Sequence, residues 1–72
     1  MKKIGTVIRK SRREKEISQE KLSELLGLYK SQVHHWEKHR ESPNGTNLLL
    51  AMRFLKLKVE DFFEDEEEKK NE

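Results

Sequence analysis

The sequence predicts an all-α fold of five short helices over residues 1–63, followed by a short acidic tail over residues 64–72 that we expect to be disordered. Apolar residues recur at helical spacing in several stretches, and no stretch alternates apolar and polar residues as a half-buried strand does. The chain has no cysteine, and only 32% of its 72 residues are hydrophobic. A deep substrate cavity would remove core that so small a domain needs, so these observations disfavour an enzyme.

The first two helices are predicted from spacing and from capping residues. A first helix is expected over roughly residues 2–15, where helical spacing places on one face Ile4, Val7, Ile8 and Ser11. A second helix follows Ser18, whose hydroxyl is a good N-cap, and its inner face is formed by Leu22, Leu25 and Leu26. Gly27 stands just beyond, where a left-handed residue commonly ends a helix.

Three further helices follow. The third is expected from about Lys30 to Lys38, with Val33 and Trp36 buried and His39 beyond its end. Residues 41–45 have the composition of a turn or loop. Thr46 or Asn47 would cap a fourth helix, and its predicted buried face is Leu48, Leu49, Ala51, Met52 and Leu55. A last short helix would complete the apolar set with Leu57, Val59, Phe62 and Phe63.

The third helix has an outer face that packing does not need. Ser23 is small and Gly27 permits a sharp reversal, so the second and third helices can meet closely. The side chains left outside are polar-tipped: Tyr29, Lys30, Ser31, His34 and His35. A helix held outward in this way can enter the major groove of DNA, which is ~12 Å wide, and reach base edges.

The charge distribution favours the same kind of partner. Residues 1–59 hold 14 Lys and Arg against 6 Asp and Glu, whereas residues 60–72 hold 8 Asp and Glu against 2 Lys. A basic body is typical of a protein that binds a polyanion, most commonly nucleic acid. The tail has no apolar residue, so nothing in it would favour burial.

In these motifs the sequence resembles the Cro/C1-type helix-turn-helix regulators, also called the xenobiotic-response-element family. The resemblance runs from Ile4 to Phe63, and its motifs are, in order, Ile4-Gly5, Ile8-Arg9, Ile17 to Leu22, Leu25 to Leu28, Trp36-Glu37, Ser42-Pro43, Leu48-Leu49 and Val59 to Phe63. It implies a five-helix, lambda-repressor-like DNA-binding domain over residues 1–63. It also implies a transcription regulator, most often a repressor, that binds a palindromic operator in double-stranded DNA as a homodimer and needs no cofactor.

Residue roles follow from the resemblance by position. The residues implied to contact bases are Tyr29, Lys30, Ser31, His34 and His35. The residues implied to contact phosphates are Ser18, Gln19, Lys38, His39 and Arg40. Arg12 and Glu37 match a partly buried ion pair that ties the first helix to the third. The chain departs from the family by having, where glycine is frequent, Glu16, His39 and Lys56, and, where leucine is usual, Ser11 and Gly45.

The fourth helix suggests a second surface. Leu50 and Phe54 are expected to lie off its buried face, and with Leu57 and Phe63 they are the candidate dimer interface. The alternative for Phe54 is that it packs under the last helix. A second function remains open, in which the apolar C-terminal face binds a toxin or an anti-repressor and the protein is an antitoxin or another interaction module.

Two further expectations concern metal ions and location. His35 and His39 lie at i, i+4, but a stable zinc site needs three or four ligands, so we expect no metal. No run approaches the ~20 apolar residues that span a bilayer, and the first residues lack the apolar stretch of a signal peptide. We therefore expect no membrane partner and a cytoplasmic protein, associated with the nucleoid and encoded by a bacterium or a phage.

Overall fold

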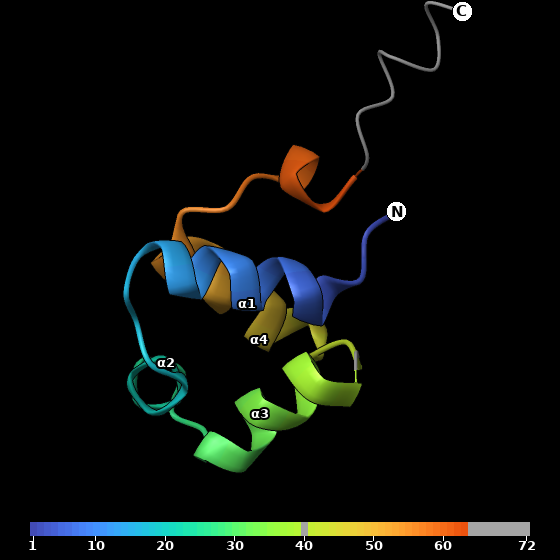
Figure 1. Cartoon of the computed structure of the whole chain (residues 1–72). Coiled ribbons are helices and arrows are strands. Elements are labelled where there is room, and N and C mark those ends of the chain that lie inside the picture. The colour runs from blue at the N-terminus through green and yellow to red at the C-terminus, as the bar shows by residue number, and fades with distance from the viewer. Residues whose placement is uncertain (40, 64–72) are drawn as a thin grey trace, which may run out of the picture.

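The computed structural model describes residues 1–39 and 41–63. The described residues form four α-helices and one 3-10 helix: α1 (Ile4–Glu14), α2 (Gln19–Leu26), α3 (Lys30–His39), α4 (Gly45–Leu55) and η1 (Val59–Phe62) (Figure 1). They contain no strand, so the predicted all-α class is confirmed. The expected fifth helix is a single 3-10 turn. The acidic tail, residues 64–72, lies outside the described residues, as does Arg40.

The predicted boundaries of α2 are confirmed in detail. The backbone N–H of Lys21 donates to the Ser18 hydroxyl at 2.9 Å, so Ser18 is the N-cap. Gly27 ends the helix in the left-handed conformation, with φ at 72°. Leu28 N–H then donates to the Ser23 carbonyl at 2.8 Å, which closes the end of the helix.

The start of α4 differs from the prediction. The cap is Asn44, whose side-chain oxygen accepts from the backbone N–H of Asn47 at 2.8 Å. Neither Thr46 nor Asn47 is the cap, because both already lie inside the helix, which begins at Gly45. An Asn side chain satisfies a free N–H of the first turn as well as a Ser or Thr hydroxyl does, and the observed cap lies two residues before Thr46 and three before Asn47.

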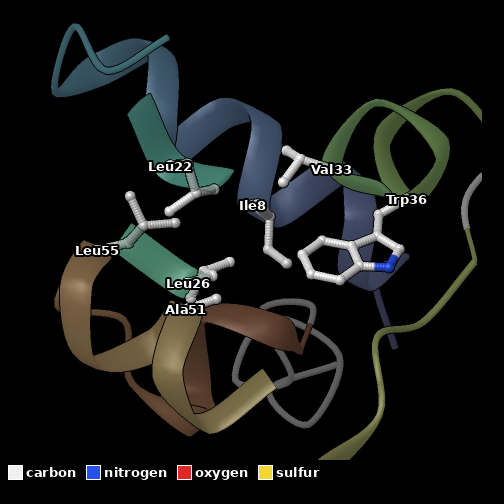
Figure 2. Packing of buried hydrophobic residues seen from close by; sticks show 7 residues of the cluster. All are labelled: Ile8, Leu22, Leu26, Val33, Trp36, Ala51 and Leu55. Atoms are coloured by element: carbon white, nitrogen blue, oxygen red, sulfur yellow. The ribbon is translucent and has the colours of Figure 1, made fainter. Parts of the chain in front are cut away.

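The core lies between α1, α2, α3 and α4. Its buried residues are Ile8, Leu22, Leu26, Val33, Trp36, Ala51 and Leu55, and in Figure 2 the Trp36 ring points into this cluster. Phe62 is also buried and brings η1 against the domain. The backbone of Lys2 donates to the Phe62 carbonyl at 2.9 Å, so the two ends of the described chain are joined beside α1.

The first helix approaches the third unusually closely at Gly5. A Cβ atom at this position would lie 2.0 Å from the carbonyl oxygen of Trp36. No side chain can occupy that space, so glycine is required by the crossing of α1 and α3. This contact sets how far α3 stands from the rest of the molecule.

Four members of the predicted apolar faces are exposed. Leu49 is 68% exposed, and Leu25, Val59 and Phe63 are exposed as well. In α4 the buried residues are Ala51 and Leu55, and Leu50 packs against the core from one side. Leu49 lies about 120–160° around the helix from Leu55 and Ala51, and its inclusion in the core was wrong because the unbroken apolar run over residues 48–52 conceals which side is buried.

The helix ends that lack the family's glycine behave in two ways. Glu16 and Lys56 adopt the left-handed conformation, with φ at 58° and 57°. His39 does not, because it is the last residue of α3 and not a residue beyond it as predicted. A left-handed residue with a side chain costs about 1–2 kcal/mol, so the chain ends α1 and α4 under local strain.

Candidate nucleic-acid interface

α3 is held by one face and leaves the other free. Its buried residues are Val33, Trp36 and Glu37. The exposed ones include all of the residues on α3 that the sequence assigns to bases: Lys30, Ser31, His34 and His35. Tyr29, directly before the helix, is 80% exposed. Figure 1 shows α3 at the edge of the bundle with no other element over its outer side.

The first turn of α3 is closed by a side chain that sequence reasoning did not single out. Gln32 accepts through its Oε1 atom from the backbone N–H of Tyr29 at 2.9 Å. The contact satisfies an N–H group at the start of the helix. It fixes the turn between α2 and α3 at the point where the exposed face begins.

A buried polar network sets the orientation of α3. The structure brings Arg12 and Glu37 together, with Nε and Nη2 of Arg12 donating to the two carboxylate oxygens at 2.8 and 2.9 Å. Arg12 also donates to the carbonyl of Ile17 at 2.8 Å. Gln19 donates to the same carboxylate at 3.0 Å. The Glu37 side chain is only 3% exposed, so one carboxylate links α1, α2 and α3 inside the protein.

A hollow of about 330 Å³ lies beside this network. α1 contributes Arg9 and Arg13 to its lining, and α3 contributes His34 and Lys38. Gln19 and the buried Glu37 also reach it, but the Glu37 carboxylate is already occupied by its donors. The remaining lining groups are three cations, the Gln19 amide, the His34 imidazole and the Thr6 hydroxyl, and this combination is suited to a phosphate group.

Arg9 and Arg13 are therefore candidate contacts that the sequence analysis missed. They lie one turn apart on α1 and flank Arg12. Their i, i+4 spacing shows that they share one face of the helix. It does not show that this face borders α3, since that depends on how the two helices cross.

The histidines of α3 make contacts near the end of the helix. Nε2 of His35 lies 2.9 Å from Oε1 of Glu41, and both side chains are largely exposed. The rings of His35 and His39 are 4.5 Å apart, because the helix continues through His39. Within residues 1–39 and 41–63, no group of three or more His, Asp or Glu is arranged to hold a metal ion.

The residues assigned to phosphates are only partly together. Gln19 and Lys38 line the same hollow, and His39 is exposed at the end of α3. The Ser18 hydroxyl is used as the cap of α2. Arg40 lies outside the described residues.

The candidate dimer residues divide into two pairs. Leu50 and Leu57 are half-buried and pack against the core cluster, so Leu50 lies closer to the core than expected, and the assignment of both residues to a dimer interface stays a prediction. Phe54 and Phe63 are 37% and 44% exposed. Two other apolar side chains, Leu49 and Val59, are more exposed than either and belong to the same C-terminal elements.

Comparison with known proteins gives one match. A family model described as Helix-turn-helix covers residues 8–62, which is most of the chain and includes α2, the turn at Gly27 and α3. No curated protein and no solved structure matches the chain. Among the described residues, no helix is long and apolar enough to cross a membrane.

Proposed function

The chain belongs to the helix-turn-helix family, and we propose that it is a sequence-specific regulator of transcription, a repressor, that binds a palindromic operator with α3 in the major groove. The observation that carries the proposal is the division of α3 into a buried face and an exposed polar one. A major groove accepts one helix, and its base edges are read by polar side chains. The protein would act in the cytoplasm, on DNA of a bacterial or phage genome.

Base contacts are assigned to the amino-terminal part of α3. The proposed set is Tyr29, Lys30, Ser31, His34 and His35. Lys30 is the candidate for a guanine contact, because its ammonium can donate to O6 and N7. His35 would have to leave Glu41 to reach a base, since that carboxylate lies 2.9 Å from its Nε2 atom.

Phosphate contacts are assigned to the hollow between α1 and α3. Arg9, Arg13 and Lys38 supply positive charge there, and Gln19 supplies an amide. Ser18, His39 and Arg40 complete the set that the sequence assigns to phosphates. Contacts to phosphates fix register and affinity without selecting a sequence.

The buried network would make α3 a rigid reading element. Arg12 and Gln19 both donate to Glu37, so α3 is tied to α1 and α2 by directional bonds. A reading helix has to keep its angle to the groove, because a small rotation moves its side chains away from the base edges. Arg12 and Glu37 are therefore proposed as positioning residues.

A homodimer is proposed because a palindromic operator requires a two-fold protein. Its half-sites would be centred about one helical turn apart, ~34 Å. Phe54 and Phe63 are the exposed members of the candidate interface. Leu50 and Leu57 would support that surface from below, since they pack against the core.

A second candidate function is a protein-interaction module, such as an antitoxin that covers a toxin or a partner of an anti-repressor. The exposed apolar side chains of the C-terminal elements favour it: Leu49, Phe54, Val59 and Phe63. Exposed apolar residues in number on a small domain are typical of a partner surface. Co-purification of a second small protein from the source cells would favour this function.

The decisive experiment is selection of bound sequences from a pool of random duplexes by the protein alone. We expect the selected sequences to share a palindromic motif. The protein should bind that motif at least about 10³-fold more tightly than a scrambled duplex at the same salt concentration. Analytical ultracentrifugation of the complex should give two chains per site. Enrichment of no sequence, with equal affinity for all duplexes, would contradict the proposal.

A further inference from the structure

The hollow between α1 and α3 concentrates positive charge that the described residues do not compensate. Three cations line it: Arg9, Arg13 and Lys38. Among the described residues, Glu37 is the only acid in the lining, and its carboxylate already accepts three hydrogen bonds. The hollow therefore attracts an acidic partner, and DNA is not the only source of one.

The sequence supplies acids next to the described fold. Phe63 follows η1, and the next five residues are all acidic: Glu64, Asp65, Glu66, Glu67 and Glu68. We call residues 64–68 the acidic stretch. Because it contains no apolar side chain, its interactions with the rest of the chain are electrostatic.

A second hollow, of about 380 Å³, lies on the other side of α1 and is a poorer partner for these acids. Its lining includes lysines, among them Lys10 and Lys15, but also the carboxylates of Glu14 and Asp61. Acids among the lysines reduce the attraction for a further acid. The charge distribution thus favours the hollow between α1 and α3.

The acidic stretch starts close enough to reach that hollow. The backbone N–H of Lys2 donates to the Phe62 carbonyl at 2.9 Å, which holds η1 beside the first turn of α1 (Figure 1). Thr6, in that turn, already lines the hollow between α1 and α3. From the start of α1 to Arg13 is about 14 Å at 1.5 Å per residue, and five residues can span about 17 Å when extended.

We propose that the acidic stretch competes with DNA for the hollow between α1 and α3. The proposal rests on the proposed function, because it takes this hollow as the phosphate site. Carboxylates and phosphates pair with the same Arg and Lys side chains, and a tethered group competes at a high local concentration. The competition would weaken binding to all duplexes alike, because phosphate contacts carry no sequence information, and salt would reduce it.

The first test asks whether the acidic stretch reaches the hollow without DNA. Because the chain has no cysteine, Asn71→Cys accepts a single nitroxide label, which broadens nearby amide resonances of the full isotope-labelled chain. At low salt concentration we expect broadening at Arg9, Arg13 and Lys38. We expect none at Lys21, an exposed cation of α2 that lines neither hollow.

The matched variant keeps the label and neutralises the acidic stretch. Its substitutions are Glu64→Gln, Asp65→Asn, Glu66→Gln, Glu67→Gln and Glu68→Gln. The broadening at the hollow should disappear in this variant, because the charges that hold the stretch there are gone. Broadening that persists without the charges, or that is as strong at Lys21 as at Arg13, would overturn the proposal.

The second test measures affinity. Without the label, the neutralised chain should bind a scrambled duplex and the selected operator about fivefold more tightly than the unchanged chain at low salt concentration. Neutralisation also raises the net charge, so the gain is compared in two further backgrounds. In Arg13→Gln it should fall to about twofold, because a partner of the acidic stretch is lost, whereas in Lys21→Gln it should stay about fivefold.

Equal gains in the Arg13→Gln and Lys21→Gln backgrounds would overturn the proposal, since net charge alone would then explain the effect. The label experiment needs no DNA, and the scrambled duplex needs no operator. If both give the expected results while selection enriches no sequence, the proposed function fails and the competition stands. If an operator is selected and neither test responds, only the competition fails.

Discussion

Different contacts join the α1–α3 side and the α4–η1 side of the molecule to the same core. Between α1, α2 and α3, Glu37 receives hydrogen bonds from Arg12 and Gln19, and Gly5 lets α1 meet the backbone of α3. On the other side, α4 contributes Ala51 and Leu55 through apolar packing, and among the described residues η1 adds the buried Phe62 and one backbone hydrogen bond, from Lys2 N–H to the Phe62 carbonyl. Hydrogen bonds and a backbone contact fix direction as well as distance, whereas apolar burial has no direction.

This difference indicates that the angle between α1 and α3 has to be defined, whereas α4 and η1 only have to bury the apolar core. The proposed reading helix, α3, lies on the α1–α3 side, which we call the directional side. The hydrogen bonds to Glu37 fix its rotation and therefore determine which of its residues are exposed. The α4–η1 side carries exposed apolar residues and the left-handed Lys56. We therefore expect substitutions on the directional side to lower the unfolding free energy and the operator affinity strongly. Substitutions on the α4–η1 side should have smaller effects on both.

The largest effect is expected from Glu37→Ala. The variant leaves the Arg12 guanidinium buried without its carboxylate, and breaking a buried ion pair in this way costs about 3–5 kcal/mol. That is a large share of the stability of a domain this small, so much of the variant should be unfolded at room temperature. The measurement is the free energy of unfolding from urea denaturation followed by circular dichroism.

The matched control is Glu41→Ala, which removes the carboxylate of the exposed pair with His35. Exposed pairs contribute about 0–1 kcal/mol, so this variant should unfold almost as the unchanged chain does. An equal loss of unfolding free energy in the two variants would show that the buried ion pair stabilises the fold no more than the exposed one does.

The next effect is expected from Gly5→Ala. Its methyl group would overlap the Trp36 carbonyl, so α1 and α3 have to separate, and overpacking of this kind costs about 1–3 kcal/mol. Because the separation moves α3, the affinity for a selected operator should fall in the fraction that remains folded. Urea denaturation and a fluorescence titration with labelled duplex measure the two effects.

Gly45→Ala is the control on the other side. A Cβ atom at Gly45 meets nothing within 4 Å, and alanine is the better helix former by about 1 kcal/mol. The variant should be as stable as the unchanged chain or slightly more stable. A loss as large as that of Gly5→Ala would contradict the contrast between the two sides.

The third comparison lies within the directional side, between bases and phosphates. Lys30→Ala should cost about 1–3 kcal/mol for the selected operator and relax specificity at one position. Arg13→Ala should weaken binding to selected and scrambled duplexes alike. It should also lower the slope of log affinity against log salt concentration by about one. Titrations of both duplexes at several salt concentrations separate these outcomes, and an equal loss for Lys30→Ala on the two duplexes would remove its assignment to a base.

The parts of the fold that the sequence could predict are those set by local chemistry. Ser18 and Gly27 have side-chain and backbone preferences that mark the ends of α2, and both lie where they were expected. The face of α4 was harder to predict because apolar residues surround the helix, so Leu49 was placed inside and Leu50 outside. Asn44 was overlooked as the cap because it stands in a run of turn-forming residues.

The parts that could not be predicted depend on how helices cross. Gly5 has no special place in α1 until α3 lies against it. Arg9 and Arg13 share a face that borders α3 only in the folded chain. The exposed residues of α3 could thus be predicted because they are the ones that the core does not need. Arg9 and Arg13 of α1, which line the same hollow as His34 and Lys38, could not.

The smallest expected effect concerns the helix ends, where the two sides are alike. α1 and α4 end as α2 does, with a backbone N–H beyond the helix donating to a carbonyl five residues earlier. Ile17 N–H donates to the Arg12 carbonyl at 2.9 Å, and Leu57 N–H donates to the Met52 carbonyl at 2.8 Å. Of these three helices, only α2 has glycine at the left-handed position. Glu16→Gly and Lys56→Gly should each relieve about 1–2 kcal/mol of strain, less about 0.5–1 kcal/mol because glycine gives the unfolded chain more freedom.

Each variant should therefore be slightly more stable, and Gly27→Ala should be less stable. Thermal denaturation of the three variants measures both signs. Because Glu16 and Lys56 close helices on opposite sides of the molecule, similar gains would place the strain in the backbone itself. A gain at one position alone would mean that the surroundings of the other, the directional network near Glu16 or the apolar packing near Lys56, already compensate for it.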